Sequence, residues 1–248
     1  MNSADYQANT PYARFGSLAI DAPVDVRRTF IRKTYVNLMV AIYAFVALEW
    51  LFFSLGWEVR ALQLLGNTPM TWLLVMGAFF VVSVVANRWA QSGTSPAMQY
   101  AGLYLYVVAE ALIFLPLLAL AKMQTVTIQG VGDVNVIAAA GATTLIIFGG
   151  LTAYTFVTKQ DFSFLGRFLG LAMISAIALI VVSIIFGLHI GVWFVWAMVV
   201  LASGYILYYT SNVLHHYRTD QHVAAALALF ASVALLFWYV IQLFMRRD

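Results

Sequence analysis

Two acidic side chains, Glu49 and Glu110, stand inside long apolar stretches of a sequence that has only ten acidic residues in 248. An ionisable group at membrane depth needs a partner or a water-filled cavity, so such residues are candidates for ion or proton pathways. Glu110 lies six residues before Pro116, which cannot donate a helical hydrogen bond and leaves a carbonyl free nearby. We expect Glu110 to titrate or coordinate a cation. Alternatively, it is a protonated acid that hydrogen-bonds a tyrosine or carbonyl and holds helices together.

Glu49 and Arg88 lie nearer the ends of their apolar stretches than Glu110 does. Glu49 is within reach of the membrane interface, where snorkelling or interfacial hydrogen bonding is a simpler interpretation than a place in an ion pathway. Arg88 closes its stretch in the manner of an arginine that sets membrane orientation.

A histidine-rich segment near the C-terminus contains His215, His216, Asp220 and His222. Adjacent histidines point about 100° apart on a helix, and His215 and His222 would be roughly 10 Å apart, so we expect no shared metal ion. Histidine changes charge near neutral pH. His215, His216 and Asp220 therefore form a candidate pH-sensing loop, with an ordinary exposed loop as the alternative.

The elements that position these groups must lie in a membrane, because the composition does not fit a soluble domain. Hydrophobic residues make up 63% and charged residues 9% of the chain, with a mean hydropathy of +0.89, whereas soluble domains carry about 25% charged residues. So few charges cannot cover a water-facing surface. A soluble enzyme, a nucleic-acid-binding module and a disordered chain are excluded.

No motif for catalysis, metal binding or cofactor binding is visible. Cysteine is absent, which removes disulfides, thiol nucleophiles and zinc-thiolate sites. The sequence also has no phosphate loop, no Ser/His/Asp set and no HExxH motif. We expect no enzymatic activity, no cofactor and no resident metal.

Seven apolar runs are long enough to cross a membrane as helices. They are apolar on every face, unlike the alternating segments of a membrane barrel. The predicted architecture is an all-α bundle of seven transmembrane helices, at about residues 34–55, 70–87, 98–121, 134–157, 164–186, 192–213 and 221–244.

The predicted organisation is a polar, basic N-terminal tail at 1–33 and one transmembrane domain at 34–248. Nine of the thirteen Lys and Arg residues fall on the N-terminal side of the membrane, which predicts a cytoplasmic N-terminus. Arg246 and Arg247 violate the rule, and a six-span chain with a re-entrant last segment is the alternative.

Several ordered segments resemble the Bax inhibitor-1 family of multi-pass membrane proteins over nearly the whole chain after the tail. Individually they are short, but their order around seven apolar runs is specific. They are Phe30-Ile31-Arg32-Lys33-Thr34-Tyr35, Lys159-Gln160-Asp161-Phe162-Ser163-Phe164-Leu165, Gly204-Tyr205-Ile206-Leu207-Tyr208, Ala226-Leu227-Ala228-Leu229-Phe230 and Leu235-Leu236-Phe237.

The resemblance implies six helices around a central C-terminal helix and a pH-sensitive calcium leak linked to stress survival. It also implies two aspartates on the last two helices that share a proton and latch the pore, with an arginine from the second helix nearby. Here the two positions hold Tyr209 and Ser232, while Arg88 matches the arginine approximately. A diaspartyl latch cannot operate in this chain, although Tyr209 could hydrogen-bond Ser232 across the helices.

Two functional hypotheses follow. The favoured one is a calcium or proton leak pathway for ion homeostasis, in which Glu110 or the His215/His216 group replaces the lost latch. The alternative is a membrane-embedded regulator that binds another membrane protein, such as a quality-control protease, without conducting ions. Both place the chain in a lipid bilayer, the bacterial inner membrane by resemblance, with no nucleic-acid partner.

Overall fold

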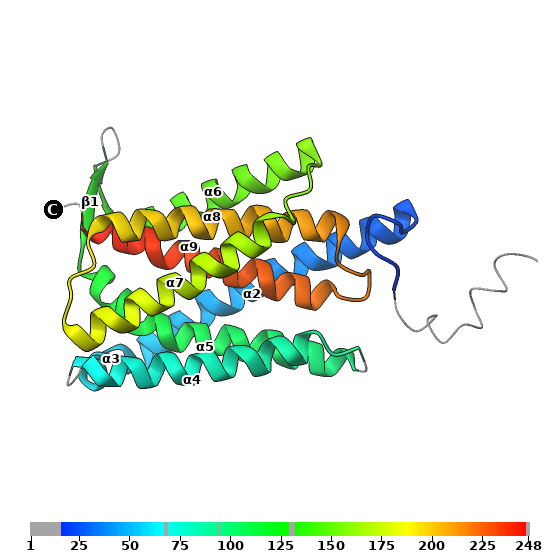
Figure 1. The fold of residues 1–248 in the computed structure, drawn as a ribbon. Helices are drawn as coiled ribbons and strands as arrows, with labels where there is room; N and C mark the ends of the chain where they lie inside the picture. The colour runs from blue at the N-terminus through cyan, green and yellow to red at the C-terminus, as the bar shows by residue number, and fades with distance from the viewer. Residues whose placement is uncertain (1–15, 67–68, 94, 129–131, 247–248) are drawn as a thin grey trace, which may run out of the picture.

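The computed structural model describes residues 16–66, 69–93, 95–128 and 132–246. Within these ranges the chain forms eight helices and one β-hairpin (Figure 1). Seven of the helices are long and apolar enough to cross a membrane, so the chain is an all-α, seven-span membrane protein. The elements are α2 (Val24–Ser54), α3 (Trp57–Gly66), α4 (Pro69–Ala90), α5 (Pro96–Lys122), β1 (Thr125–Ile128), β2 (Gly132–Asn135), α6 (Val136–Thr158), α7 (Leu165–Phe186), α8 (Val192–His215) and α9 (His222–Met245).

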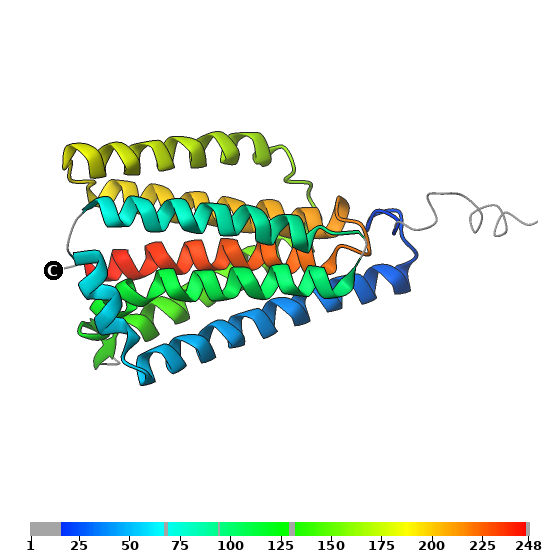
Figure 2. The same ribbon diagram turned by 90° about the horizontal axis from the view of Figure 1, so that it is seen from below.

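Helix α9 is the centre of the bundle, as predicted. It packs against α2, α4, α5, α6 and α8, while α7 completes the ring by packing on α8 and α4. Figure 2 shows α9, in red, enclosed by its neighbours. The sequence of α9 explains its place: its first half is rich in alanine and leucine and apolar on every face, so helices can approach it from all sides. Its single unbroken helix of 24 residues also argues against the re-entrant alternative.

The predicted apolar runs match the helices to within three residues at each boundary except one. Helix α2 begins at Val24 and not at residue 34. Its first turns carry polar and charged side chains, so they are helical but lie outside the apolar run. Part of the segment predicted as tail is therefore helical. Residues 1–15, with Arg14, and the last two residues, with Arg247, lie outside the described residues.

Two elements were not predicted. The short helix α3 occupies the break between the first two spans, and the strands β1 and β2 pair antiparallel between α5 and α6. The segment Thr125–Ile128 is rich in β-branched residues, which favour strands. Asn135 ends the hairpin and caps α6, because its side-chain oxygen accepts the N–H of Ile137 at 2.9 Å.

Two glycines allow neighbouring helices to touch closely. A Cβ at Gly102 of α5 would lie 2.5 Å from the backbone oxygen of Ala86 in α4, and one at Gly166 of α7 would lie 2.7 Å from the ring of Tyr208 in α8. Gly170, one turn further along α7, faces open space instead. Of these two glycines of α7, only Gly166 therefore serves packing within the chain.

The N-terminal segment of the described chain is joined to the turn between α8 and α9. Ala19 donates its N–H to the Tyr217 carbonyl at 2.9 Å, and Thr219 donates to the Ser17 carbonyl at 3.0 Å. Leu18 and Arg218 form the bridge between them. This pairing ties residues 17–19 to the same end of the bundle as the start of α2.

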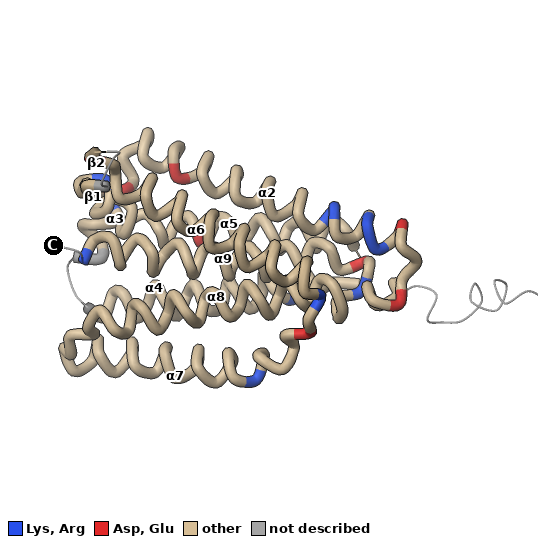
Figure 3. The backbone as a smooth tube through the Cα atoms, turned by 90° about the horizontal axis from the view of Figure 1, so that it is seen from above, with Lys and Arg blue, Asp and Glu red and all other residues tan. Residues whose placement is uncertain are grey.

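The bundle has two distinct ends. We call the end where α2, α5 and α9 begin the N-terminal end, and the end where they finish the C-terminal end. Figure 3 shows charged residues gathered at both ends, with blue prevailing at the N-terminal end. Among the described residues that end carries eight basic residues (Arg27, Arg28, Arg32, Lys33, Arg88, Lys159, Arg167 and Arg218) and the other carries three (Arg60, Lys122 and Arg246).

Candidate functional site

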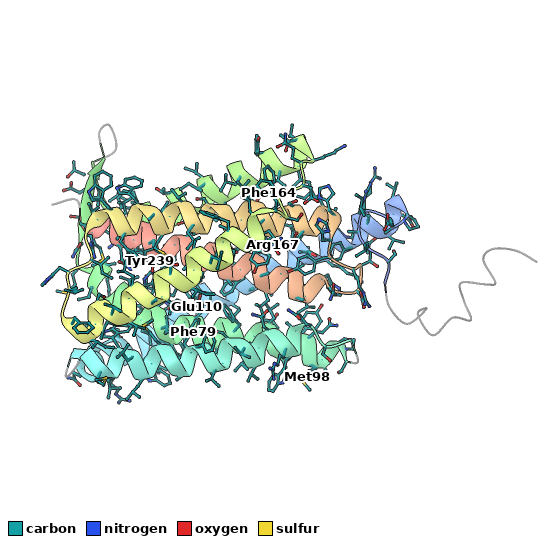
Figure 4. All side chains as sticks on the ribbon, in the orientation of Figure 1. Phe79, Met98, Glu110, Phe164, Arg167 and Tyr239 are labelled. Carbon is teal, nitrogen blue, oxygen red and sulfur yellow. The ribbon has the colours of Figure 1, made fainter. Side chains whose placement is uncertain are left out.

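Glu110 lies midway along α5, in the interior of the bundle. Its side chain is buried, with 6% of its surface exposed, and Tyr106 one turn earlier hydrogen-bonds its carboxyl group. Figure 4 places Glu110 midway between Tyr239, toward the C-terminal end, and Arg167 and Met98, toward the N-terminal end. Helix α5 runs unbroken past Pro116. Glu110 is thus buried and has a tyrosine partner. This arrangement fits both a titrating or cation-coordinating group and a protonated acid that holds helices together.

Tyr106 connects Glu110 to the rest of the interior. Its ring meets Phe230 of α9 edge-on at 6.2 Å and Phe79 of α4 at 5.8 Å. Its hydroxyl also interacts electrostatically with Tyr209 of α8. Glu110 therefore belongs to a polar group built from α5 and α8 and lined by rings from α4 and α9.

Tyr209 and Ser232 do not form the predicted hydrogen bond across the helices. The Ser232 hydroxyl donates to the carbonyl of Ala228 in its own helix at 2.8 Å. Tyr209 instead stacks on Tyr205 at 5.9 Å and meets Tyr208 edge-on at 4.9 Å. A helical serine readily donates to the carbonyl one turn back, which satisfies Ser232 without its neighbour.

On the C-terminal side of Glu110, four rings from α2, α5 and α9 pack together. Phe114 meets Phe45 of α2 edge-on at 5.1 Å, stacks on Phe237 of α9 at 5.6 Å and meets Trp238 edge-on at 5.0 Å. We call Phe45, Phe114, Phe237 and Trp238 the aromatic cluster. Glu110 lies on the N-terminal side of the aromatic cluster.

Glu49 corrects the interfacial interpretation. Its side chain is buried, with 6% exposed, on the stripe of α2 that also carries Phe45 and Phe52. Neither carboxyl oxygen has a hydrogen-bond partner among the described residues. Snorkelling is therefore wrong for this residue, because the stripe that carries it faces the bundle and not the interface.

Arg88 is exposed in the last turn of α4. It does not lie in the interior with Tyr209 and Ser232, so the approximate match to a pore arginine places no cation in the centre of this bundle. Its position at the N-terminal end fits an orientation-setting arginine.

The candidate pH-sensing loop splits into separate contacts. His216 pairs with Asp161 of the α6–α7 loop at 2.9 Å, whereas Asp220 pairs with Arg218 at 2.9 Å. His215 contacts the Ser211 carbonyl at 3.0 Å. The structure thus brings His216 to a carboxylate that the sequence had not assigned to it.

Asp161 is held in its ionised form. Desolvation opposes this, but hydrogen bonds from Ser163 and His216 outweigh it and lower the pKa of Asp161 to about 2. The same loop is fixed to α8 by the Phe162 N–H, which donates to the Ser211 hydroxyl at 2.8 Å. Both contacts join segments about fifty residues apart, so spacing along the chain gives no signal for them.

Two further polar features appear only in three dimensions. The hydroxyl of Tyr35 in α2 faces Thr152 of α6 and Thr210 of α8, yet within the described chain none of the three completes a hydrogen bond of ordinary geometry. A cavity of about 120 Å³ opens at the N-terminal end between the α4–α5 and α8–α9 turns. Its lining includes Gln91, Gln99, Arg218, Asp220 and Gln221.

Within the described ranges, no group of three or more histidine, aspartate or glutamate side chains could hold a metal ion. The buried carboxyls are instead single groups on different helices. An isolated carboxyl suits proton binding better than calcium, which takes six to eight oxygen ligands.

Comparison with known proteins gives matches along most of the chain. The profile of the family described as inhibitor of apoptosis-promoting Bax1 matches residues 27–248. Bax inhibitor 1 of Schizosaccharomyces pombe is 27% identical over 226 residues, covering 88% of this chain and 76% of that protein. The modulator of FtsH protease YccA of Escherichia coli is 27% identical over 184 residues, covering 72% and 76%.

A shorter match is found in Pseudomonas aeruginosa. An uncharacterised protein there is 32% identical over 113 residues, and the match spans 44% of this chain and half the length of that relative.

Proposed function

This chain belongs to the family of inhibitors of apoptosis-promoting Bax1, and from that premise we propose that it is a membrane-embedded regulator that acts by binding another membrane protein. This is the alternative that the sequence left beside the ion leak. The proposed partner is a membrane-bound quality-control protease, and the chain itself carries out no catalysis.

The packing of the bundle centre carries this proposal. The aromatic cluster fills the space between α2, α5 and α9, through which a permeation route along the central helix would pass. The positions that the resemblance assigns to a proton-sharing latch hold Tyr209 and Ser232, and the Ser232 hydroxyl is bonded within its own helix. A regulator needs neither a pore nor a latch.

The relatives support the same choice. One of them is named a modulator of FtsH protease, and the match covers more than two thirds of both chains. A chain that modulates a protease from within the membrane needs outward-facing helices for contact. Helices α4 and α7 are the least buried spans, with 6% and 17% of their most apolar windows inside the bundle.

We also propose a bacterial inner-membrane location with a cytoplasmic N-terminus. Eight of the eleven described basic residues lie at the N-terminal end, where blue prevails in Figure 3, and Lys and Arg favour the cytoplasmic side. The proposed protease partner would then share the same membrane.

Co-purification from gently solubilised membranes tests the regulator. Tagged chain should retain a membrane protease of the FtsH type, and adding the chain to that protease in liposomes should change its rate of substrate degradation. A chain that emerges alone and leaves proteolysis unchanged would contradict the proposal.

Three glycines provide matched surface variants. Gly77 of α4, Gly149 of α6 and Gly170 of α7 all have open space where a Cβ would stand. Replacing each with tryptophan should leave the fold intact and alter only the outward face of one helix. Loss of the partner in one variant, with the other two unaffected, would identify the docking helix.

A calcium or proton leak remains the second candidate, because Glu110 is buried midway along a span beside a hydroxyl partner. Liposome flux assays between about pH 5 and 8 would test it, since histidine changes charge in that range. A leak through Glu110 requires flux from wild type that falls in Glu110→Gln. Flux no greater than that of empty liposomes would exclude it.

A further inference from the structure

The side chains that line the interior of the bundle differ on the two sides of Glu110. On its N-terminal side lie three tyrosines, which we call the tyrosine chain: Tyr217 in the α8–α9 turn, Tyr209 in α8 and Tyr106 in α5. Tyr217 interacts electrostatically with Tyr209, and Tyr209 with Tyr106, whose hydroxyl bonds the Glu110 carboxyl. By their positions in the α8–α9 turn, α8 and α5, these three tyrosines lie between the N-terminal end of the bundle and Glu110.

The outer end of this chain is polar. Tyr217 is adjacent to Arg218, which lines the cavity at the N-terminal end together with Asp220 and Gln221. Tyr208, the neighbour of Tyr209, also interacts with Tyr217. Water at that end therefore meets hydroxyl and amide groups, with which it can form hydrogen bonds.

The other side of Glu110 is lined by aromatic rings. Phe114, one turn further along α5, has 1% of its surface exposed and is in contact with Phe45, Phe237 and Trp238. Phe230 adds a ring that touches both Phe45, at 6.1 Å, and Tyr106. Apart from the Trp238 indole N–H, these packed aromatic rings offer water no hydrogen-bond partners, so they separate Glu110 from the C-terminal end.

We propose that Glu110 is a proton-binding site that exchanges with water only at the N-terminal end of the bundle, along the tyrosine chain, and that the aromatic cluster seals it from the opposite side. The carboxylate takes one proton from a hydronium ion and releases it to water by the same route. The Tyr106 hydroxyl donates to the carboxylate in one state and can accept from the carboxylic acid in the other.

Other ionisable groups on the surrounding helices do not act on Glu110. Two factors contribute to the electrostatics of Glu110: its burial and, among the described side chains, Tyr106. The remaining buried or half-buried ionisable groups on helices packed against α5 are, within the described chain, Arg27, Tyr35 and Glu49 of α2, Glu58 of α3, and His222 and Tyr239 of α9. Arg88, on α4, is exposed.

This inference goes beyond the proposed function and stands apart from it. A regulator that conducts nothing can still bind a proton from one side, and a chain that fails to bind a protease can do so equally. The experiment therefore measures protonation and its sidedness, not partner binding or flux.

The test uses the full chain in a solid-supported bilayer, tethered by a tag at either terminus so that one chosen end of the bundle faces the bulk solution. Infrared difference spectroscopy after a jump in bulk pH reports the carbonyl stretch of a protonated carboxyl group. We expect the band to respond promptly when the N-terminal end faces the bulk and to lose that response when the C-terminal end does.

Variants assign the band. Glu110→Gln should abolish it, whereas the matched control Glu49→Gln should keep it. Tyr106→Phe should shift its frequency through the lost hydrogen bond, which provides a second readout if Glu110→Gln folds poorly. Tyr209→Phe should slow its appearance.

Three results would overturn the proposal: a band that survives Glu110→Gln, an equal response from both sides, or a response from the C-terminal end alone. An unchanged frequency in Tyr106→Phe would also count against it.

Discussion

The two buried carboxyls of the bundle lie in regions that treat them differently. Glu110, on α5, has the Tyr106 hydroxyl on its carboxyl group, and Tyr106 in turn interacts electrostatically with Tyr209 of α8. Glu49, on α2 near the short helix α3, is equally buried but has no hydrogen-bond partner among the described residues. Burial in the membrane interior therefore does not by itself make a carboxyl a functional site, because a buried polar group without partners destabilises the fold.

Removing the ring that separates the two regions should have the largest effect. Phe114 touches Phe45, Phe237 and Trp238, so Phe114→Ala should lower the free energy of unfolding by about 3 to 5 kcal/mol through lost contacts and a residual cavity. Chemical unfolding in mixed micelles, followed by circular dichroism, measures the change.

Phe168 of α7 is the matched control, because its side chain is 68% exposed and faces outward. Phe168→Ala should change the unfolding free energy far less. Similar losses for the two variants would mean that the aromatic cluster is not the close-packed barrier on which the comparison of the regions depends.

Removing a hydrogen-bonded carboxyl without its partner should destabilise the fold. Glu110→Leu leaves the buried Tyr106 hydroxyl without its partner, which should cost about 1 to 3 kcal/mol of unfolding free energy. The double variant Glu110→Leu with Tyr106→Phe should recover much of that loss, because neither half of the hydrogen bond then remains. Losses that simply add would argue against a Glu110–Tyr106 bond.

Much of the fold followed from hydropathy, because a membrane span has to be long and apolar throughout. The same criterion could not find the first turns of α2, where Asp25, Arg27 and Arg28 are helical outside the apolar run. Nor could it find α3 or the β1–β2 hairpin, which are too short to span a membrane. The run of four β-branched residues at Thr125–Ile128, in which polar and apolar side chains alternate, was the available signal for the hairpin.

The candidate site was predicted only where the signal is local. Glu110 and a neighbouring tyrosine follow from four-residue spacing on one helix. The electrostatic interaction of Tyr209 with Tyr106, and the pairing of His216 with Asp161, depend on how elements distant in the sequence are placed relative to one another. Glu49 was misplaced for the same reason, since distance from a span end does not say which face of the helix points inward.

Removing a buried carboxyl that has no hydrogen-bond partner among the described residues should stabilise the fold. Glu49→Leu replaces two buried, unbonded oxygens with a side chain of similar size, so it should raise the unfolding free energy by about 1 to 2 kcal/mol. The thermal midpoint in detergent micelles would rise accordingly, opposite in sign to Glu110→Leu. A loss of stability in Glu49→Leu would reveal a partner for this carboxyl and remove the contrast between the two regions.

Asp161 provides an exposed carboxyl against which both buried ones can be compared, and its effect should be the smallest. Its pair with His216 is about half exposed, so Asp161→Asn should cost less than about 1 kcal/mol near neutral pH. Although desolvation acts the other way, the hydrogen bonds from Ser163 and His216 lower the pKa of Asp161 to about 2, below the usual value of about 3.9. Ionised Asp161 therefore stabilises the fold fully above about pH 4, and this contribution is lost as the pH falls through about 2. Unfolding curves of wild type and Asp161→Asn should differ at neutral pH and converge in acid, whereas a difference that widened in acid would mean that folding favours the protonated carboxyl.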